Sequence, residues 1–143
     1  MKIRRDKRDT VFSSLVRGRT NWTCEVCKRY FPEGNRQGLH CSHHYSRRHK
    51  GLRYHPQNAS AHCYACHQRL GENPLEFAAW INAKIGTESA ENLRIMATRI
   101  SKYSKPELED IYQNMQAELV RMESLRADGD TRRIEFESPY SED

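Results

Sequence analysis

Residues 40–67 concentrate the side chains that can bind a metal ion or transfer a proton. The stretch reads HCSHHYSRRHKGLRYHPQNASAHCYACH and contains all seven histidines and three of the five cysteines of the chain. It also contains several Arg and Lys residues but no Asp or Glu. Because nothing within the segment offsets these positive charges, we expect an anionic partner to approach it.

The cysteines form two CxxC pairs, Cys24/Cys27 and Cys63/Cys66, with 35 residues between them. Each pair can present two thiolates from a tight turn, and two such turns make the closed tetrahedral site of structural zinc. A redox CxxC pair occurs singly on a βαβ unit, which this sequence lacks, and disulfides are typical of secreted chains. The spacing therefore predicts one structural zinc ion. Cys41 is left over, either as a small buried hydrophobic residue or as a residue close to a metal.

The order of the polar residues between and after these pairs resembles that of a known superfamily. His43 and His44 lie between the two pairs, Asn58 follows them, and His67 comes directly after Cys66. This order resembles the HNH (ββα-metal) endonuclease superfamily, which uses a histidine-bearing strand, an Asn in the connecting loop and a His on a helix. The resemblance is closest to phage recombination-type nucleases of the NinG/Rap kind and covers about residues 20–127. The motifs that carry it are Cys41-Ser42-His43, Ser46-Arg47-Arg48, Arg53, Pro56, Asn58, Cys63-x-x-Cys66 and Gly71-Glu72-Asn73-Pro74.

The resemblance implies metal-dependent hydrolysis of DNA phosphodiester bonds. A histidine on the strand would act as the general base that takes a proton from the attacking water. His67 would bind the catalytic ion from the helix, and Asn58 would pin the hairpin and orient the base. Mg²⁺ or Mn²⁺ is the expected catalytic ion, although imidazole ligands also suit Ni²⁺ or Zn²⁺.

This chain departs from the common pattern at the residue before the base, which is often an Asp that binds the ion. If His44 is the base, His43 replaces that Asp. If His43 is the base, Ser42 precedes it, and His40 or Cys41 must supply the ligand. The recombination-type motif, in which an aromatic residue often follows the base, favours His43. The other histidines are expected to be surface or hydrogen-bonded residues; they are His49, His55 and His62.

The charge distribution favours a nucleic-acid partner. Residues 1–71 carry 15 Lys and Arg against 4 Asp and Glu, whereas residues 72–143 carry 9 against 15. A basic half of this kind attracts polyanions such as duplex or branched DNA. The expected phosphate contacts are Arg47, Arg48, Lys50 and Arg53. The same features are also typical of a zinc-stabilised DNA-binding module without catalysis, and this alternative stays open.

The expected fold is α+β, a small zinc-stapled ββα-metal (HNH) core with a helical C-terminal extension. We expect a basic N-terminal arm at 1–19, the core at 20–72, the helical extension at 73–127 and an acidic, disordered tail at 128–143. Thr10 could cap a first short helix, and Asn73-Pro74 and Ser104-Lys105-Pro106-Glu107 are helix start signals. Gly86 and Asp128-Gly129 are the corresponding stop signals. The thiols and the lack of a membrane-length apolar run predict a cytoplasmic protein.

The last predicted helix carries an apolar seam at alternating spacings of four and three. Its members are Leu108, Tyr112, Met115, Leu119 and Met122. Such a seam either folds back on its own domain or forms a homodimer through the helix at 105–127.

Overall fold

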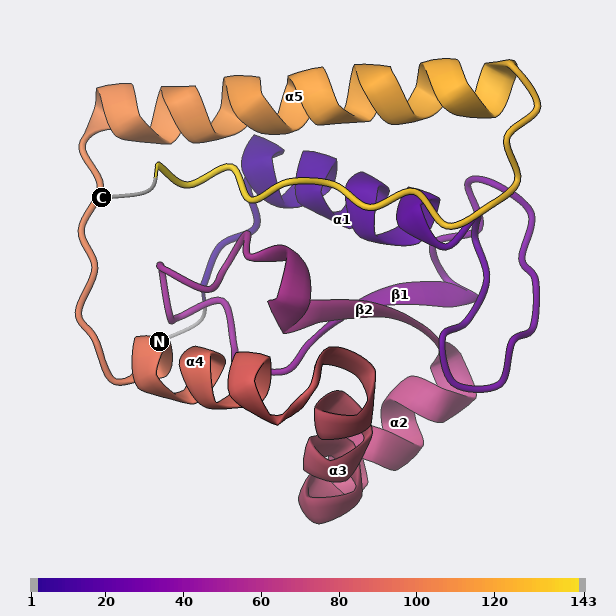
Figure 1. The fold of residues 1–143 in the computed structure, drawn as a ribbon, viewed down its shortest axis with the longest axis horizontal. Helices are drawn as coiled ribbons and strands as arrows, with labels where there is room; N and C mark the ends of the chain where they lie inside the picture. Colours follow the sequence, from indigo (N-terminus) through magenta and orange to yellow (C-terminus); the bar gives the residue numbers. More distant parts are fainter. Residues whose placement is uncertain (1–2, 142–143) are drawn as a thin grey trace.

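The computed structural model of the protein describes residues 3–141, which form an α+β fold of five α-helices and one two-stranded antiparallel sheet. The helices are α1 (Lys7–Arg19), α2 (Tyr64–Glu72), α3 (Pro74–Ile85), α4 (Thr87–Ala97) and α5 (Lys105–Ala127). The strands are β1 (Leu39–His43) and β2 (Ala59–Cys63), and the short 3-10 turn η1 (Pro56–Asn58) directly precedes β2. Helix α5 lies along α1, α1 covers one face of the sheet, and α2, α3 and α4 lie on the other side (Figure 1).

The strand register divides the histidines of β1 between two faces. His40 pairs with His62, and His43 pairs with Ala59. Because successive side chains of a strand point to opposite faces, His43 faces α1, where its ring lies 5.6 Å from that of Phe12. His40 faces α2, where its ring lies 5.1 Å from that of His67. The two predicted site histidines on β1 are therefore not on the same side of the sheet.

Helix α1 begins earlier than the sequence analysis predicts. The Asp6 side chain accepts hydrogen bonds from the backbone N–H groups of Arg8 and Asp9, at 2.9 and 3.2 Å. The Asp9 side chain in turn accepts the N–H of Asp6 at 2.8 Å, which completes a capping box. The predicted cap at Thr10 is wrong, and most of the predicted basic arm, Lys7–Arg19, is helix α1. Residues 1–2 of that arm lie outside the described range.

The predicted boundaries of the C-terminal helices agree with the structure. The Ser104 hydroxyl accepts the N–H of Glu107 at 3.2 Å, and the Glu107 carboxylate accepts the N–H of Ser104 at 3.0 Å. Gly86, whose φ is 86°, ends α3 and begins α4, a backbone conformation that favours glycine. Helix α5 ends at Asp128-Gly129, as expected.

The apolar seam of α5 packs on its own chain. Met115 and Met122 are buried with Ile111, a residue that the predicted seam omits. Met122 lies against Gly18 of α1, where a Cβ atom would come within 2.6 Å of the Met122 sulfur. The absent side chain of Gly18 thus lets α5 approach α1 closely. Dimerisation through the same helix stays a prediction.

The C-terminal segment returns along α1 and joins the core. Ile134 and Phe136 are buried, and the N–H of Ile134 donates to the carbonyl of Arg19 at 3.0 Å. The segment runs beside α1 and under α5, where it is yellow in Figure 1. The expected disorder is therefore wrong for the described part of the tail, while residues 142–143 lie outside it. The segment is mainly acidic in composition, so its two apolar residues did not suggest a buried segment. Ile134 and Phe136 are two residues apart, the spacing that places side chains on one face of an extended chain.

Phe136→Ala should destabilise the protein strongly. The Phe136 ring packs edge-to-face on Phe12 with centroids 6.0 Å apart, and the Arg19 guanidinium lies over it at 4.9 Å. Removing a buried phenyl ring costs about 3–5 kcal/mol in free energy of unfolding. Denaturant unfolding should show this loss, whereas Ile100→Ala, at a side chain that is 93% exposed, should change stability by less than about 0.5 kcal/mol. Equal stability of the two variants would contradict the packing of the tail.

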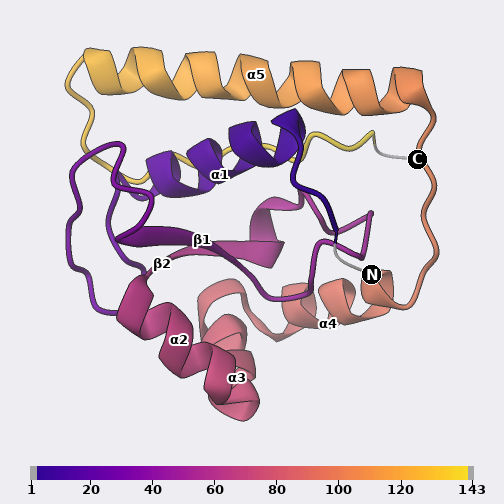
Figure 2. The ribbon, with the colours of Figure 1, turned by 180° about the vertical axis from the view of Figure 1, so that it is seen from behind.

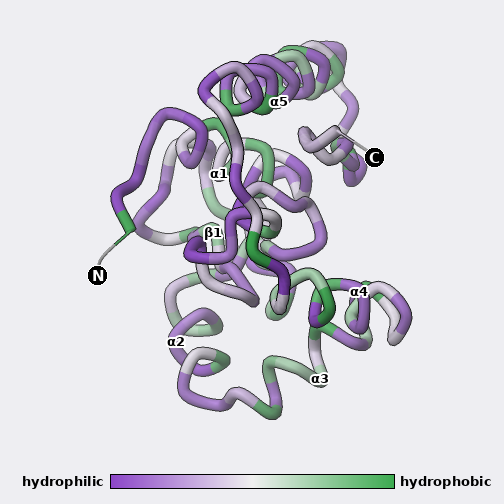
Figure 3. Tube along the Cα trace, turned by 90° about the vertical axis from the view of Figure 1, so that its left-hand side faces the viewer, coloured by the Kyte–Doolittle hydropathy of each residue, from purple (hydrophilic) through white to green (hydrophobic). Residues whose placement is uncertain are grey.

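The hydropathy of the elements follows this layering. Val11, Phe12, Leu15 and Val16 of α1 are buried, and Figure 3 shows hydrophilic and hydrophobic positions in turn along α5. Within residues 3–141, none of the helices combines the length and the apolar character that crossing a bilayer requires.

Candidate metal centres and histidine face

The four predicted zinc ligands converge on one point. Cys24 and Cys27 lie on the hairpin after α1, which is closed by a bridge between Thr23 and Tyr30. Cys63 ends β2, and Cys66 lies in the first turn of α2. The four sulfur atoms all lie within 4.8 Å of one another.

The sulfur spacing fits a tetrahedral zinc site. The Sγ atoms of Cys27 and Cys63 are 3.8 Å apart. Four sulfurs at the usual Zn–S distance of about 2.3 Å lie about 3.8 Å from each other. The Cys63 sulfur also accepts the backbone N–H of Cys66 at 3.5 Å, a contact that orients a ligand thiolate. The described residues therefore contain a four-cysteine metal site, which is compatible with structural zinc.

The thiols also oppose one another's ionisation. Burial raises the pKa of Cys66 to about 12, and the neighbouring Cys63 and Cys24 add to this effect. Four thiolates can share this volume only when a cation offsets their charge, as zinc does.

Cys41 lies on the α1 side of β1, apart from this group, and burial raises the pKa of its thiol. A half-buried thiol with a raised pKa is less reactive than a free one.

A second cluster of potential ligands lies where β1 faces α2. The Nδ1 atoms of His40 and His67 are 2.9 Å apart and form a hydrogen bond. The Nε2 atom of His40 lies 2.9 Å from the carbonyl oxygen of Gln37, to which it must donate, so the Nδ1 lone pair of a neutral His40 faces His67. Burial, followed by the proximity of His40, lowers the pKa of His67 and favours its neutral form. Neutral imidazole is the form that binds metals.

His62 is the buried neighbour of this pair. Its side chain is completely buried, and neither ring nitrogen has a hydrogen-bond partner among residues 3–141. Burial lowers the pKa of His62 to about 4, so the ring is neutral. The His62 ring lies 6.4 Å from that of His67 and packs against Trp80 at 4.8 Å and Phe77 at 5.8 Å. The expectation of a surface or hydrogen-bonded His62 is wrong, because the aromatic residues of α3 cover it.

The two candidate bases differ in their surroundings. The Nε2 atom of His43 donates to the carbonyl of Arg53 at 3.0 Å, and its ring packs on Phe12. His44 instead lies on the α3 side, with its ring 5.3 Å from that of Phe77. Burial lowers the pKa of both imidazoles, so both are neutral at pH 7.

Asn58 closes the loop that joins the two strands. Its Oδ1 accepts the N–H of Tyr45 at 2.8 Å, and its Nδ2 donates to the carbonyls of Tyr45 and Leu52 at 2.9 and 3.0 Å. Its backbone carbonyl accepts the N–H of His44 at 2.9 Å. The fully buried side chain thus fixes the backbone at Tyr45 and Leu52, and the backbone carbonyl of Asn58 fixes that of His44. A part of Asn58 in catalysis stays a prediction.

The predicted DNA contacts divide into two kinds. Arg53 forms an ion pair with the buried Asp9 at 2.5 Å, and Arg47 lies 3.4 Å from the same carboxylate. Asp9 of α1 therefore offsets part of the charge that residues 40–67 cannot offset themselves, and Arg47 and Arg53 are paired within the chain. Arg48 and Lys50 are exposed, and neither has an ion-pair partner within residues 3–141. These two remain suited to contact phosphates.

The ion pair at Asp9 should make stability depend on acid pH. Burial alone would raise the pKa of the Asp9 carboxyl, but hydrogen bonds from Arg53 and from the N–H of Asp6 outweigh it and hold the pKa below the usual 3.8. A lowered folded-state pKa contributes stability that is present above the unfolded value and is lost as pH falls through both values. The melting temperature should therefore fall more steeply below about pH 5 in wild type than in Asp9→Asn. Parallel pH profiles would show that the carboxylate adds nothing.

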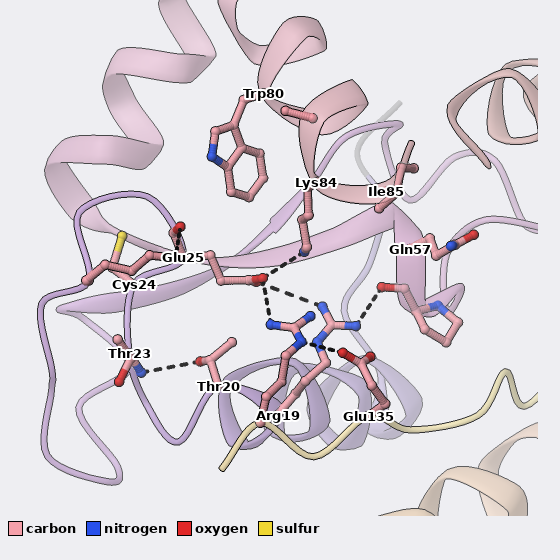
Figure 4. A pocket seen from close by; sticks show the side chains of 14 residues that line it. Arg19, Thr20, Thr23, Cys24, Glu25, Gln57, Trp80, Lys84, Ile85 and Glu135 are labelled. Carbon is pink, nitrogen blue, oxygen red and sulfur yellow. Dashed lines mark hydrogen bonds and ion pairs between the residues drawn. The ribbon is translucent and has the colours of Figure 1, made fainter. Parts of the chain in front are cut away.

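A cavity of about 760 Å³ lies behind the cysteine hairpin, between α1, α3 and the C-terminal segment (Figure 4). Its polar centre is Glu25, which accepts the N–H of Ala61 at 2.7 Å and lies 2.9 Å from Lys84 Nζ and 3.0 Å from Arg133. Burial would raise the pKa of Glu25, but Lys84 and Arg19 lower it to about 2. The charged Glu25 thus ties the hairpin to β2, α3 and the C-terminal segment. Ala61 lies 36 residues from Glu25 and Arg133 lies 108 residues from it, so no local sequence pattern could reveal this role.

The structure thus brings together the four cysteines, and separately His40 with His67. It places His43 on the opposite face of the sheet, and the rings of Phe77 and His62 lie between His44 and His67. Comparison of the chain with protein-family models, with curated proteins and with solved structures finds no match.

Proposed function

We propose that this protein is a metal-dependent endonuclease that hydrolyses DNA phosphodiester bonds. The observation that carries the proposal is the separation of 2.9 Å between the Nδ1 atoms of His40 and His67. Two imidazole nitrogens that bind one octahedral ion at about 2.1 Å lie about 3.0 Å apart, whereas a tetrahedral zinc ion would hold them about 3.4 Å apart. The pair projects from a strand and a helix that the four-cysteine site fixes at Cys63 and Cys66. This arrangement supports the strand-and-helix site that the resemblance to HNH nucleases implies.

The ligand atoms bear on the identity of the catalytic ion. Mg²⁺ prefers oxygen ligands, whereas imidazole suits Mn²⁺ less well than Ni²⁺ or Zn²⁺. Because the paired ligands are both imidazoles, the ligand type favours Ni²⁺ or Zn²⁺ over the Mg²⁺ or Mn²⁺ expected from the sequence. Such an ion, when bound, polarises a phosphoryl oxygen and stabilises the leaving oxygen.

His44 is the better-supported base. Its ring lies on the same side of the sheet as His40 and His67, it is neutral at pH 7, and Asn58 fixes its backbone. His43 uses Nε2 to hold the carbonyl of Arg53 and packs against α1. The resemblance alone favours His43, but the geometry supports His44 as the residue that takes the proton from water.

A second candidate function is a DNA-binding module without catalysis. One observation favours it. The ring of Phe77 lies against both His44 and His62, so an aromatic side chain separates the candidate base from His67. In addition, residues 3–141 contain a single group of three or more converging potential ligands, the four cysteines. A zinc-stabilised binding module needs only this one metal site and no catalytic ion.

Plasmid cleavage distinguishes the two functions. Plasmid and branched DNA are incubated with the protein and Mg²⁺, Mn²⁺, Ni²⁺ or Zn²⁺ in separate reactions, and with EDTA. The nuclease should nick DNA with at least one ion and stop when EDTA is added. Zinc content is measured in parallel, because EDTA could also remove the structural ion. Tight DNA binding without cleavage under every ion would establish the binding module.

A further inference from the structure

A basic groove lies between the loop after β1 and the linker from α4 to α5. It has a volume of about 570 Å³. One wall consists of Ser46, Arg48, His49 and Lys50, and the other of residues 97–102. Figure 2 shows this loop lying beside the C-terminal end of α4. We infer that this linker groove holds the phosphodiester backbone of DNA, an inference that rests on the proposed function and names its substrate-binding surface.

The charges of the linker groove are all of one sign. Arg48 and Lys50 project from the loop, and Arg99 and Lys102 from the linker, while none of the lining residues is an Asp or Glu. All four cations are exposed, and none of them pairs with a carboxylate in the described part of the chain. By contrast, the cavity behind the cysteine hairpin contains Glu25 and Glu135, which offset its cations. An uncompensated cation on a groove wall is free to replace a counterion of DNA.

The two walls are held in place before any ligand binds. A Cβ atom on Gly51 would lie 3.0 Å from the Ser101 hydroxyl, so the loop and the linker touch there. Tyr140 fixes the loop, since its hydroxyl donates to the carbonyl of Lys50 at 2.7 Å and accepts the N–H of Tyr54 at 2.9 Å. The Tyr140 ring also packs on Tyr103 of the linker, with centroids 5.6 Å apart. A preformed groove loses little conformational entropy when it binds.

The linker groove leads toward the candidate base. The ring of His49, in the groove wall, lies 5.8 Å from that of Tyr45, which in turn lies 4.6 Å from that of His44. A linear polyanion seated between the four cations therefore passes close to His44. Tyr45 offers an aromatic face on which a base could stack. This arrangement assigns the helical extension a part in binding DNA, because Arg99 and Lys102 belong to it.

The test measures binding without cleavage. A short fluorescein-labelled DNA duplex is titrated by anisotropy, without added divalent ions, between about 0.05 and 0.2 M salt. Arg99→Gln/Lys102→Gln should reduce the slope of log K against log salt by about 1.8, or about 0.9 for each phosphate that the variant no longer neutralises, and should weaken binding about tenfold or more. Arg48→Gln/Lys50→Gln should have the same effect. The matched control is Arg29→Gln/Arg36→Gln, which changes net charge equally at two exposed residues outside the groove that likewise have no ion-pair partner within residues 3–141.

The possible outcomes test DNA binding by the groove and nuclease activity independently of each other. A slope in Arg99→Gln/Lys102→Gln that equals that of wild type overturns the inference. An equal loss of affinity in the control variant also overturns it, because net charge would then account for binding. Selective loss of affinity in the groove variants of a protein that never cleaves DNA supports the groove and rejects the nuclease. If those variants cleave DNA and bind it as tightly as wild type, the nuclease is supported and the groove is rejected.

Discussion

Cys63→Ser should abolish tight zinc binding and unfold the core. Cys63 ends β2, caps α2 through its sulfur and lies 3.8 Å from the Cys27 sulfur, so one substitution affects the strand, the helix and the ion together. Binding of structural zinc contributes about 10–16 kcal/mol in zinc-finger peptides. A domain is stable by only about 5–15 kcal/mol, so loss of the ion can exceed its whole stability. Metal analysis should find one zinc per chain in wild type and none in the variant, whose circular dichroism should show loss of helix.

Cys41→Ala is the matched control for this experiment. It removes a thiol that lies on β1 but outside the four-cysteine group. It should keep the zinc ion and lose only the packing of one small side chain, about 1 kcal/mol. A folded Cys63→Ser protein without zinc would contradict the structural role of the site. Loss of zinc in Cys41→Ala would instead enlarge the ligand set.

The features that the sequence predicted correctly are those that depend on local chemistry. Two CxxC pairs are typical of a structural zinc site, so the sequence alone predicted that the four cysteines come together. The capping box at Ser104 and Glu107 spans only four residues, and the stop at Gly86 needs only its own backbone freedom. Each of these signals is complete within a short window.

The features that the sequence analysis missed depend on contacts between distant segments. Asp9 neutralises Arg53 across 44 residues, so a charge count over residues 40–67 could not reveal the pair. Phe136 is buried because α1 and α5 leave space for it, although its own neighbours are acidic. The faces of His43 and His44 follow from which side of the sheet α1 covers, and strand periodicity alone cannot determine that side.

The histidine variants should give the second large effect, a loss of DNA cleavage. His44→Ala removes the proposed general base, which typically costs about 10²–10⁴ in rate, and added metal should not restore it. His67→Ala and His40→Ala remove proposed ligands, so their activity should return in part at higher concentrations of the divalent ion. Initial nicking rates over a metal titration measure both responses. Zinc content and DNA affinity, measured on the same preparations, should stay near those of wild type.

His43→Gln decides which of the two adjacent histidines is the base. A glutamine amide can still donate to the carbonyl of Arg53, as the His43 Nε2 does at 3.0 Å, but it cannot accept a proton from water. With His44 as the base, His43→Gln should cleave at nearly the wild-type rate. A loss of two or more orders of magnitude in His43→Gln, with His44→Ala active, would make His43 the base and would require its side chain to leave α1 when DNA binds. Wild-type cleavage by His40→Ala, His44→Ala and His67→Ala alike would remove the histidine face from the reaction, and the DNA-binding module would be the function that the structure supports.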